Sequence, residues 1–188
     1  MINNRNEILN KFYNEICDED TRLDQKHRKL EFLTTDRYVQ KYLKPNCRIL
    51  EVGAGTGRYS LYYASQGYKV NSIEYVQHNL DVLKSKITDN MNIVAEQGDA
   101  IDLSRFEDNI FDIVLVLGPL YHLYTEEEIN KCINEAKRVC KNNGIMMFAY
   151  LPNDSIMISW ALLKGHLKFG CDNKRFDQNF KIISEPSE

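Results

Sequence analysis

Apolar residues recur every three or four positions in two segments near the start of the chain, over 4–16 and 27–43. This spacing places them on one side of a helix, so it predicts two short amphipathic helices. The polar segment 17–26 between them predicts a loop or the beginning of the second helix. Pro45 stops the second helix, because proline has no amide hydrogen for the helical hydrogen bond.

From residue 47 onward, short apolar runs alternate with helical patterns. The runs predict strands over 47–52, 69–74, 92–96, 111–117 and 145–151. The helical patterns predict helices over 57–66, 77–87 and 125–140, the last opened by the capping-box pair Thr125 and Glu128. The strand over 111–117 is almost wholly apolar, as expected when helices cover both of its faces. The alternation predicts an α/β fold with a doubly wound parallel sheet.

The segment after residue 151 gives a weaker signal. Residues 156–169 are mostly apolar with helical spacing and predict a helix, while 176–183 predict a short strand. No repeat, low-complexity segment or long linker interrupts the chain, so its 188 residues predict a single domain.

Composition narrows the class of protein. The hydrophobic fraction of 43% and the charged fraction of 27% are ordinary for a soluble globular domain. The net charge of −3 gives no reason to expect nucleic acid or an anionic membrane as a partner. No apolar run reaches the ~20 residues of a membrane span, and the first residues lack the apolar core of a signal peptide. We therefore expect a cytoplasmic protein.

The cysteines fit the same compartment. Their number, five, is odd, and no C-x-x-C pair occurs, so neither a disulfide framework nor a zinc site is expected. Each cysteine is interpreted as a small, partly buried hydrophobe. No other group of residues has the spacing of metal ligands, and we expect no metal.

The candidate chemistry begins with residues 49–57, Ile-Leu-Glu-Val-Gly-Ala-Gly-Thr-Gly. An apolar strand pattern ends here in a carboxylate and three alternate glycines, and a helical pattern follows at once. Such a turn lets a ligand lie against bare backbone, because glycine has no Cβ to intrude. The dinucleotide fingerprint G-x-G-x-x-G would place its third glycine at position 58, where this chain has Arg58.

Two further acids lie at or just after the ends of later strands. Glu74 ends the strand expected over 69–74, and Asp99 comes just after the next one. A glycine loop with an acid at the end of the next strand is a nucleoside-binding pattern, since a carboxylate can accept from both ribose hydroxyls. Plainer interpretations are that Glu51 caps the following helix, Glu74 is a solvated strand end, and Asp99 is a turn residue.

The motif E-x-G-x-G-x-G, formed by Glu51 and the three glycines, resembles motif I of the class I S-adenosylmethionine-dependent methyltransferases. The resemblance covers about residues 30–151 and includes Glu74, the turn at 98–100 and residues 111–123. The last of these look like the strand-four segment of bacterial small-molecule methyltransferases. The resemblance implies a Rossmann-like sheet in the order 3-2-1-4-5 with helices before it, and S-adenosylmethionine as cofactor.

The same resemblance implies the residues of the cofactor site. Glu51 would lie near the methionine ammonium group, directly or through water, Glu74 would bind the ribose, and Asp99 would accept from the adenine amino group. The cofactor-binding residues implied in this way are Glu51, Gly53, Ala54, Gly55, Gly57, Glu74, Tyr75, Asp99, Ala100, Leu117 and Gly118.

Tyr121 and His122 follow the fourth strand, where the methyl acceptor is expected. His122 is a candidate general base or acceptor-orienting residue, with a purely structural histidine as the alternative, and Tyr121 is a candidate wall of the pocket. Tyr13, Arg22 and His27 lie where related enzymes place a lid over the cofactor. Arg22 is suited to binding a carboxylate and equally suited to a surface salt bridge.

Some departures from the family pattern narrow the substrate. Residues 117–121, Leu-Gly-Pro-Leu-Tyr, differ from the Asn/Asp-Pro-Pro-Tyr/Phe of enzymes that methylate the amino groups of adenine or glutamine. The family fold also adds a sixth and a seventh strand, and no clear hairpin follows residue 151. We expect a truncated C-terminal end that leaves the fifth strand as an open edge, through which a homodimer would form.

We therefore expect one methyltransferase domain over 1–188. It would comprise an N-terminal helical lid over 1–46, a cofactor-binding core over 47–151 and a partial cap or tail over 152–188. The expected function is methyl transfer to a small molecule by in-line displacement. One alternative is a cofactor-binding but inactive sensor or assembly protein. Another, disfavoured by Arg58, is an NAD-dependent oxidoreductase.

Overall fold

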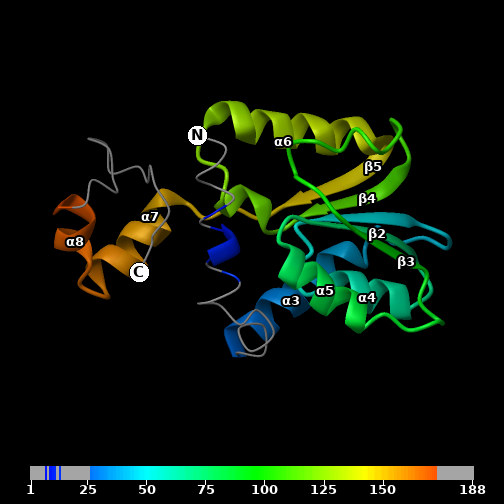
Figure 1. The fold of residues 1–188 in the computed structure, drawn as a ribbon, viewed down its shortest axis with the longest axis horizontal. Helices are drawn as coiled ribbons and strands as arrows, with labels where there is room; N and C mark the ends of the chain where they lie inside the picture. The colour runs from blue at the N-terminus through cyan, green and yellow to red at the C-terminus, as the bar shows by residue number, and fades with distance from the viewer. Residues whose placement is uncertain (1–6, 8, 12, 14–25, 173–188) are drawn as a thin grey trace.

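The structure, a computed structural model, describes residues 7, 9–11, 13 and 26–172. Its centre is a sheet of five strands, all paired in parallel, in the order β3-β2-β1-β4-β5. The strands are β1 (Arg48–Val52), β2 (Lys69–Glu74), β3 (Ile93–Gln97), β4 (Phe111–Val116) and β5 (Cys140–Phe148). The predicted Rossmann-like strand order is confirmed (Figure 1).

Helices cover both faces of the sheet. One face carries α6 (Glu126–Val139), and the other carries α3 (Lys26–Val39), α4 (Arg58–Ser65) and α5 (Gln77–Ser85) (Figure 1). The hydroxyl of Thr125 accepts from the amide of Glu128 at 3.2 Å, so the predicted capping box opens α6. Among the residues that the structure describes, none of the helices has the length and apolar character needed to cross a membrane.

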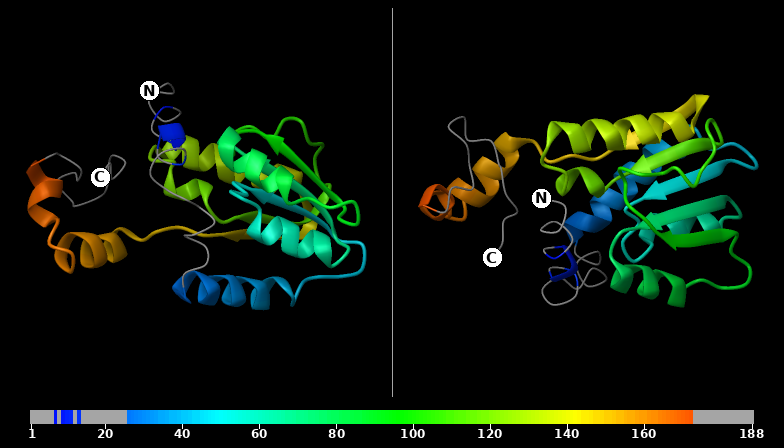
Figure 2. Two further views of the ribbon diagram at one scale, coloured as in Figure 1. Left: turned by 60° about the horizontal axis from the view of Figure 1, so that its bottom comes forward. Right: turned by 45° about the horizontal axis from the view of Figure 1, so that its top comes forward.

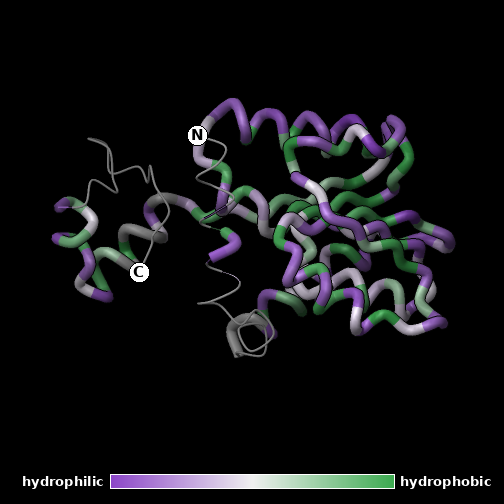
Figure 3. Tube along the Cα trace, viewed as in Figure 1, coloured by the Kyte–Doolittle hydropathy of each residue, from purple (hydrophilic) through white to green (hydrophobic). Residues whose placement is uncertain are grey.

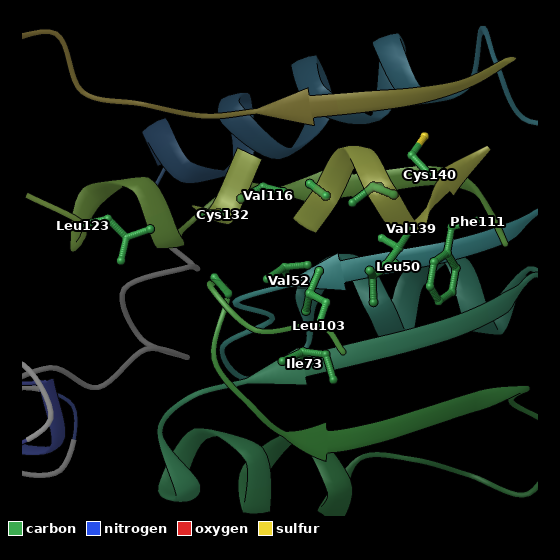
Figure 4. Close-up of a cluster of buried hydrophobic side chains, with 13 residues drawn as sticks. Leu50, Val52, Ile73, Leu103, Phe111, Val116, Leu123, Cys132, Val139 and Cys140 are labelled. Atoms are coloured by element: carbon green, nitrogen blue, oxygen red, sulfur yellow. The ribbon is translucent and has the colours of Figure 1, made fainter. Parts of the chain in front are cut away.

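The central strands are buried on both faces because successive side chains of a strand point to opposite sides. Leu50 and Val52 of β1 join a buried cluster with Val139 of α6 (Figure 4). Ile49, the residue before Leu50, packs with Tyr63 of α4 on the opposite face. The central strand β4 is accordingly apolar along almost all of its length, while the outer side of α6 is polar (Figure 3). Glu51 shares its face with Ile49, which directs it toward α4.

The fifth strand begins earlier than predicted. Cys140 pairs with Phe111 directly after α6, but Ile145 pairs with Ile113, so residues 141–144 bulge out of the ladder. Regular pairing resumes at 145, which is where the apolar pattern placed the start of the strand. Within the described residues, β5 is paired only with β4, and homodimer formation through its other edge stays a prediction.

The single helix predicted over 156–169 is wrong. The chain forms α7 (Asn153–Ile156), a π-helical turn η3 (Met157–Leu162) and α8 (Leu167–Asp172), which extend away from the sheet (Figure 2). Gly165, with a φ of 74°, separates η3 from α8. The strand predicted over 176–183 lies outside the described residues, as does most of the helix predicted over 4–16.

Four cysteines belong to the described part of the chain, and all four are free thiols. Cys47, Cys132 and Cys140 are buried, as predicted, whereas Cys171 on α8 is exposed. The prediction of burial is therefore wrong for Cys171, because the segment that carries it projects from the sheet instead of packing on it.

Candidate functional site

The turn between β1 and α4 has a backbone conformation that favours glycine. Gly53, Gly55 and Gly57 have φ angles of 73°, 55° and 90°, in the left-handed region. The amides of Gly53 and Ala54 both donate to the carbonyl of Ile73 in β2, at 2.7 and 3.1 Å. The glycine loop is therefore anchored across the carboxyl ends of β1 and β2.

Two of these glycines also serve the packing of the chain itself. A Cβ on Gly53 would lie 2.7 Å from Cδ of Pro119, and one on Gly57 would lie 2.7 Å from Cγ of Leu83. Gly53 and Gly55 line the cavity described below, whereas Gly57 does not. The structure therefore places Gly57 against α5, where its lack of a side chain lets that helix approach the loop.

Glu51 is buried at the end of β1 and bound to the first turn of α4, with 3% of its surface exposed. Its Oε2 accepts from the amide of Ser60 at 2.8 Å and from the hydroxyl of the same residue. Burial raises the pKa of Glu51 to about 8, the bonds from Ser60 oppose that rise, and the charge of Glu74 adds to it. Glu51 thus caps α4 and is largely protonated at neutral pH; a cation bound beside it would favour its ionised form.

Glu74 is also buried, so it is not a solvated strand end. Its Oε2 accepts from the amide of Gly55 at 2.7 Å, and its Oε1 accepts from the amide of Val76 at 2.9 Å. These two bonds join the end of β2, the glycine loop and the start of α5. A carboxylate oxygen can accept more than one hydrogen bond, so Glu74 keeps the capacity to bind hydroxyl groups of a ligand.

The ends of β3 and β4 contribute the next part of the site. Oδ1 of Asp99 accepts from the amide of Ile101 at 3.2 Å, which is the turn conformation expected of an aspartate after a strand. Asp99 and Ala100 nevertheless line the cavity, as do Leu117 and Gly118 after β4. Asp99 is therefore a turn residue and a cavity residue at once.

Tyr121 and His122 reach the cavity from a short 3₁₀ turn, η2 (Pro119–Tyr121). The amide of Tyr121 donates to Gly118 at 3.0 Å and that of His122 donates to Pro119 at 2.9 Å, which fixes the turn. The Tyr13 hydroxyl lies 3.2 Å from Nε2 of His122, a hydrogen bond between residues 109 positions apart. The N-terminal segment is thereby joined to the end of β4. Arg22 lies outside the described residues, and His27 is described only by its place in α3.

All these strand ends face one cavity of about 1020 Å³, including the part open to solvent. The predicted site residues on its wall are Glu51, Gly53, Ala54, Gly55, Glu74, Tyr75, Asp99, Ala100, Leu117, Gly118, Tyr121 and His122. The residues of the wall that the sequence did not place there are Leu9, Glu31, Arg58, Tyr59, Val76, Asn79, Gly98, Pro119 and Leu123.

Part of that second set carries a signal in the sequence. Arg58 and Tyr59 open the helix after the glycine loop, and Val76 and Asn79 lie at the start of the helix after β2. The first turn of a helix that follows a strand faces the carboxyl edge of the sheet, so position alone could have found them. Glu31 comes from α3, which precedes every strand in the sequence. No local sequence pattern therefore indicates that it lines the cavity.

A glycine turn and acids at the carboxyl ends of a parallel sheet define a Rossmann-like nucleoside-binding domain. The family model described as a methyltransferase domain matches residues 50–148. The chain belongs to this family, that of the class I S-adenosylmethionine-dependent methyltransferases, and S-adenosylmethionine is its cofactor. Because the chain belongs to the methyltransferase family, the alternative of a nicotinamide-dependent oxidoreductase is excluded.

Relatives with known sequences carry methyltransferase names. YqeM of Bacillus subtilis, whose methyltransferase name is provisional, is 25% identical over 112 residues, which cover 60% of this chain and 45% of YqeM. ECU09_1500 of Encephalitozoon cuniculi, named in the same provisional way, is 26% identical over 138 residues, 73% of this chain and 60% of that protein. The chain thus spans about half the length of the curated relatives it matches.

Solved structures share the fold. The PH0226 protein of Pyrococcus horikoshii superposes with a TM-score of 0.64 at 22% identity, over 73% of this chain and 64% of that one. A SAM-dependent methyltransferase of Methanosarcina mazei gives 0.59 at 23% identity, over 70% and 62%. A phosphoethanolamine N-methyltransferase of Haemonchus contortus, solved with phosphoethanolamine and S-adenosylhomocysteine, gives 0.62 at 20% identity, over 78% and 31%.

The cavity fits the cofactor of this family. S-adenosylmethionine carries an ammonium and a sulfonium, and the wall presents three acids at successive strand ends, Glu51, Glu74 and Asp99. Its nucleoside has no phosphates, so the loop needs to offer bare backbone and no anion-binding charge. Gly53 and Gly55 offer that backbone on the wall of the cavity.

Proposed function

We propose that this domain transfers a methyl group from S-adenosylmethionine to a small-molecule acceptor by in-line displacement. One observation carries the proposal: a single cavity brings the acids at the ends of β1, β2 and β3 together with Tyr121 and His122 after β4. The acids suit the cationic cofactor, and Tyr121 and His122 lie where a methyl acceptor would approach. The sulfonium is already a good leaving group, so the protein mainly has to align the acceptor and exclude water.

The acids have separate roles in this proposal. Glu74 accepts the ribose hydroxyls on the lone pairs that Gly55 and Val76 leave available. Asp99 accepts the adenine amino group, and the amide of Ala100 faces a ring nitrogen. Glu51 lies toward the methionine ammonium, directly or through water, and the approach of that cation converts its buried carboxyl to the ionised form.

The acceptor end has its own residues. His122 takes the proton when the acceptor must lose one, or orients the acceptor when it need not. The hydrogen bond between Tyr13 and His122 supports this role because it fixes the orientation of the imidazole ring. Tyr121 forms a wall of the pocket. Residues 1–46 act as the lid, and Leu9 and Tyr13 on the cavity wall support that assignment.

A small acceptor is favoured over a nucleic acid for two reasons. The net charge of −3 gives no attraction for a polyanion. The Leu-Gly-Pro-Leu-Tyr segment over 117–121 also lacks the polar residue and paired prolines of enzymes that methylate adenine amino groups.

The cofactor half of the proposal is tested by calorimetry on the full chain with S-adenosylhomocysteine. We expect wild-type protein to bind it and Glu74→Gln to bind at least about tenfold more weakly, because a neutral amide replaces a charge-assisted acceptor. Glu96→Gln is the matched control, since Glu96 lies on the exposed side of β3 and does not line the cavity. A folded wild-type sample that releases no heat would refute the proposal.

The acceptor half is tested by measuring S-adenosylhomocysteine formed with a panel of small-molecule acceptors. For any acceptor that reacts, His122→Gln should lower kcat by about 10²-fold while leaving cofactor affinity unchanged. Tight cofactor binding with no turnover on any acceptor would instead support the inactive sensor or assembly protein.

A further inference from the structure

Asn79 is a buried polar side chain for which the described part of the fold provides no hydrogen-bond partner. It lies in the first turn of α5 and only 2% of its surface is exposed. No described residue donates to its carboxamide or accepts from it, although every other buried acid and hydroxyl of the site is bonded. Asn79 is also on the wall of the cavity.

An unsatisfied carboxamide in this position is costly. A buried donor or acceptor without a hydrogen bond lowers stability by the desolvation of that group, and native proteins rarely leave one in place. An apolar residue of similar size would remove the cost. A polar group that faces a ligand cavity and has no partner in the protein is therefore one that a ligand satisfies.

The surroundings of Asn79 indicate which part of a ligand it meets. Leu80 and Leu83 of α5 pack with Ala54 of the glycine loop and Ala95 of β3. This places the first turn of α5 beside the loop and the end of β2, the region of Glu74. The contact between Tyr13 and His122 belongs to the turn after β4, which is a different part of the wall.

We infer that the Asn79 carboxamide hydrogen-bonds to the adenosyl group of the cofactor and donates to a ribose oxygen or purine ring nitrogen. This inference rests on the proposed function and deepens it. Ionised carboxylates only accept hydrogen bonds, so Glu74 and Asp99 can satisfy the hydroxyl and amino donors of a nucleoside, but not its acceptor atoms. The amide of Ala100 can serve one ring nitrogen, and the remaining acceptor atoms need a further donor. A carboxamide offers two N–H donors, and in the described part of the site Asn79 supplies them without a competing partner.

Three variants of the full chain test the inference by titration with S-adenosylhomocysteine and with adenosine. Asn79→Leu keeps the approximate size and removes all polarity. Asn79→Asp keeps the shape, removes the donor and suits the first turn of a helix. His78→Leu is the matched control on the same helix turn, because His78 is exposed and does not line the cavity.

Both Asn79 variants should bind both ligands about tenfold more weakly than wild type, while His78→Leu binds normally. Asn79→Leu should melt, without ligand, at the same temperature as wild type or above it, since it removes an unsatisfied polar group. Unchanged affinity of Asn79→Leu, or a lowered melting temperature, overturns the role of Asn79. Absence of binding by wild type overturns the proposed function instead, so the two failures are distinguishable.

Discussion

Replacing Glu51 by glutamine should change how the stability of the protein depends on pH. Burial raises the pKa of the Glu51 carboxyl to about 8, from an ordinary value of 4.5. The native state therefore holds this proton more tightly than the unfolded chain does. The stability that comes from the protonated group is complete below pH 4.5 and is lost as the pH rises through 8.

The size of the effect follows from the two pKa values. Each pKa unit is worth about 1.4 kcal/mol, so the window from 4.5 to 8 amounts to about 5 kcal/mol of unfolding free energy. Between about pH 5.5 and about pH 7.5, a single group with these values loses roughly 2.5 kcal/mol. Glutamine keeps a carbonyl oxygen for the Ser60 donors and has no proton to lose, so Glu51→Gln should not show this loss.

The assay is urea unfolding of wild type and Glu51→Gln across that pH range. Subtracting one free energy from the other cancels the remaining carboxyls, including Glu135, whose pKa is lowered by its bond with Arg138 and which acts in the opposite direction. Glu127→Gln, at an exposed carboxyl of α6, should run parallel to wild type. A difference between wild type and Glu51→Gln that does not vary with pH would refute the reasoning.

Gly53→Ala should lower the unfolding free energy by about 2 kcal/mol or more, for two reasons. The added Cβ would lie 2.7 Å from Cδ of Pro119, and the backbone φ of 73° is strained for any residue with a side chain. Gly67→Ala, with a φ of 87° and no atom within 4 Å, should cost only about 1 kcal/mol, and equal losses in urea titrations would contradict the clash. Arg138→Met should cost about 2 kcal/mol, since it removes two ion pairs at 2.7 Å and two bonds to backbone carbonyls; an unchanged urea midpoint would argue otherwise. Burial raises the pKa of Cys132 to about 11, so mass spectrometry should find it alkylated far more slowly in native than in unfolded protein, and rapid native labelling would disprove this.

Local patterns predicted the core of the fold because each central strand is buried in a regular way. The apolar run that became β4 is the clearest example, since helices cover both its faces. Prediction was wrong where pairing or packing beyond the segment decided the outcome. The start of β5 depends on how Cys140 meets Phe111 in the next strand, and the helix over 156–169 depends on a break at Gly165.

The site divides in the same way. The position of Glu51, Glu74 and Asp99 on the cavity wall was predictable because each lies at or just after the carboxyl end of a strand, and parallel strands bring these ends to one edge of the sheet. Gly57 is ambiguous from sequence, because a glycine can admit either a ligand or a neighbouring helix, and its role in cofactor binding stays a prediction. The packing of Leu83 against it shows the second use.

The sequence by itself determined the order of the elements, the glycine loop and the acids at the strand ends, because those features are set by spacing within one segment. Tertiary structure alone decided that Tyr13 meets His122 across 109 positions, that Glu51 keeps a proton near neutral pH, and that Asn79 is buried on the cavity wall. The physical reason is that desolvation and hydrogen-bond satisfaction are properties of everything that surrounds a group. Neighbours in the chain supply only part of those surroundings.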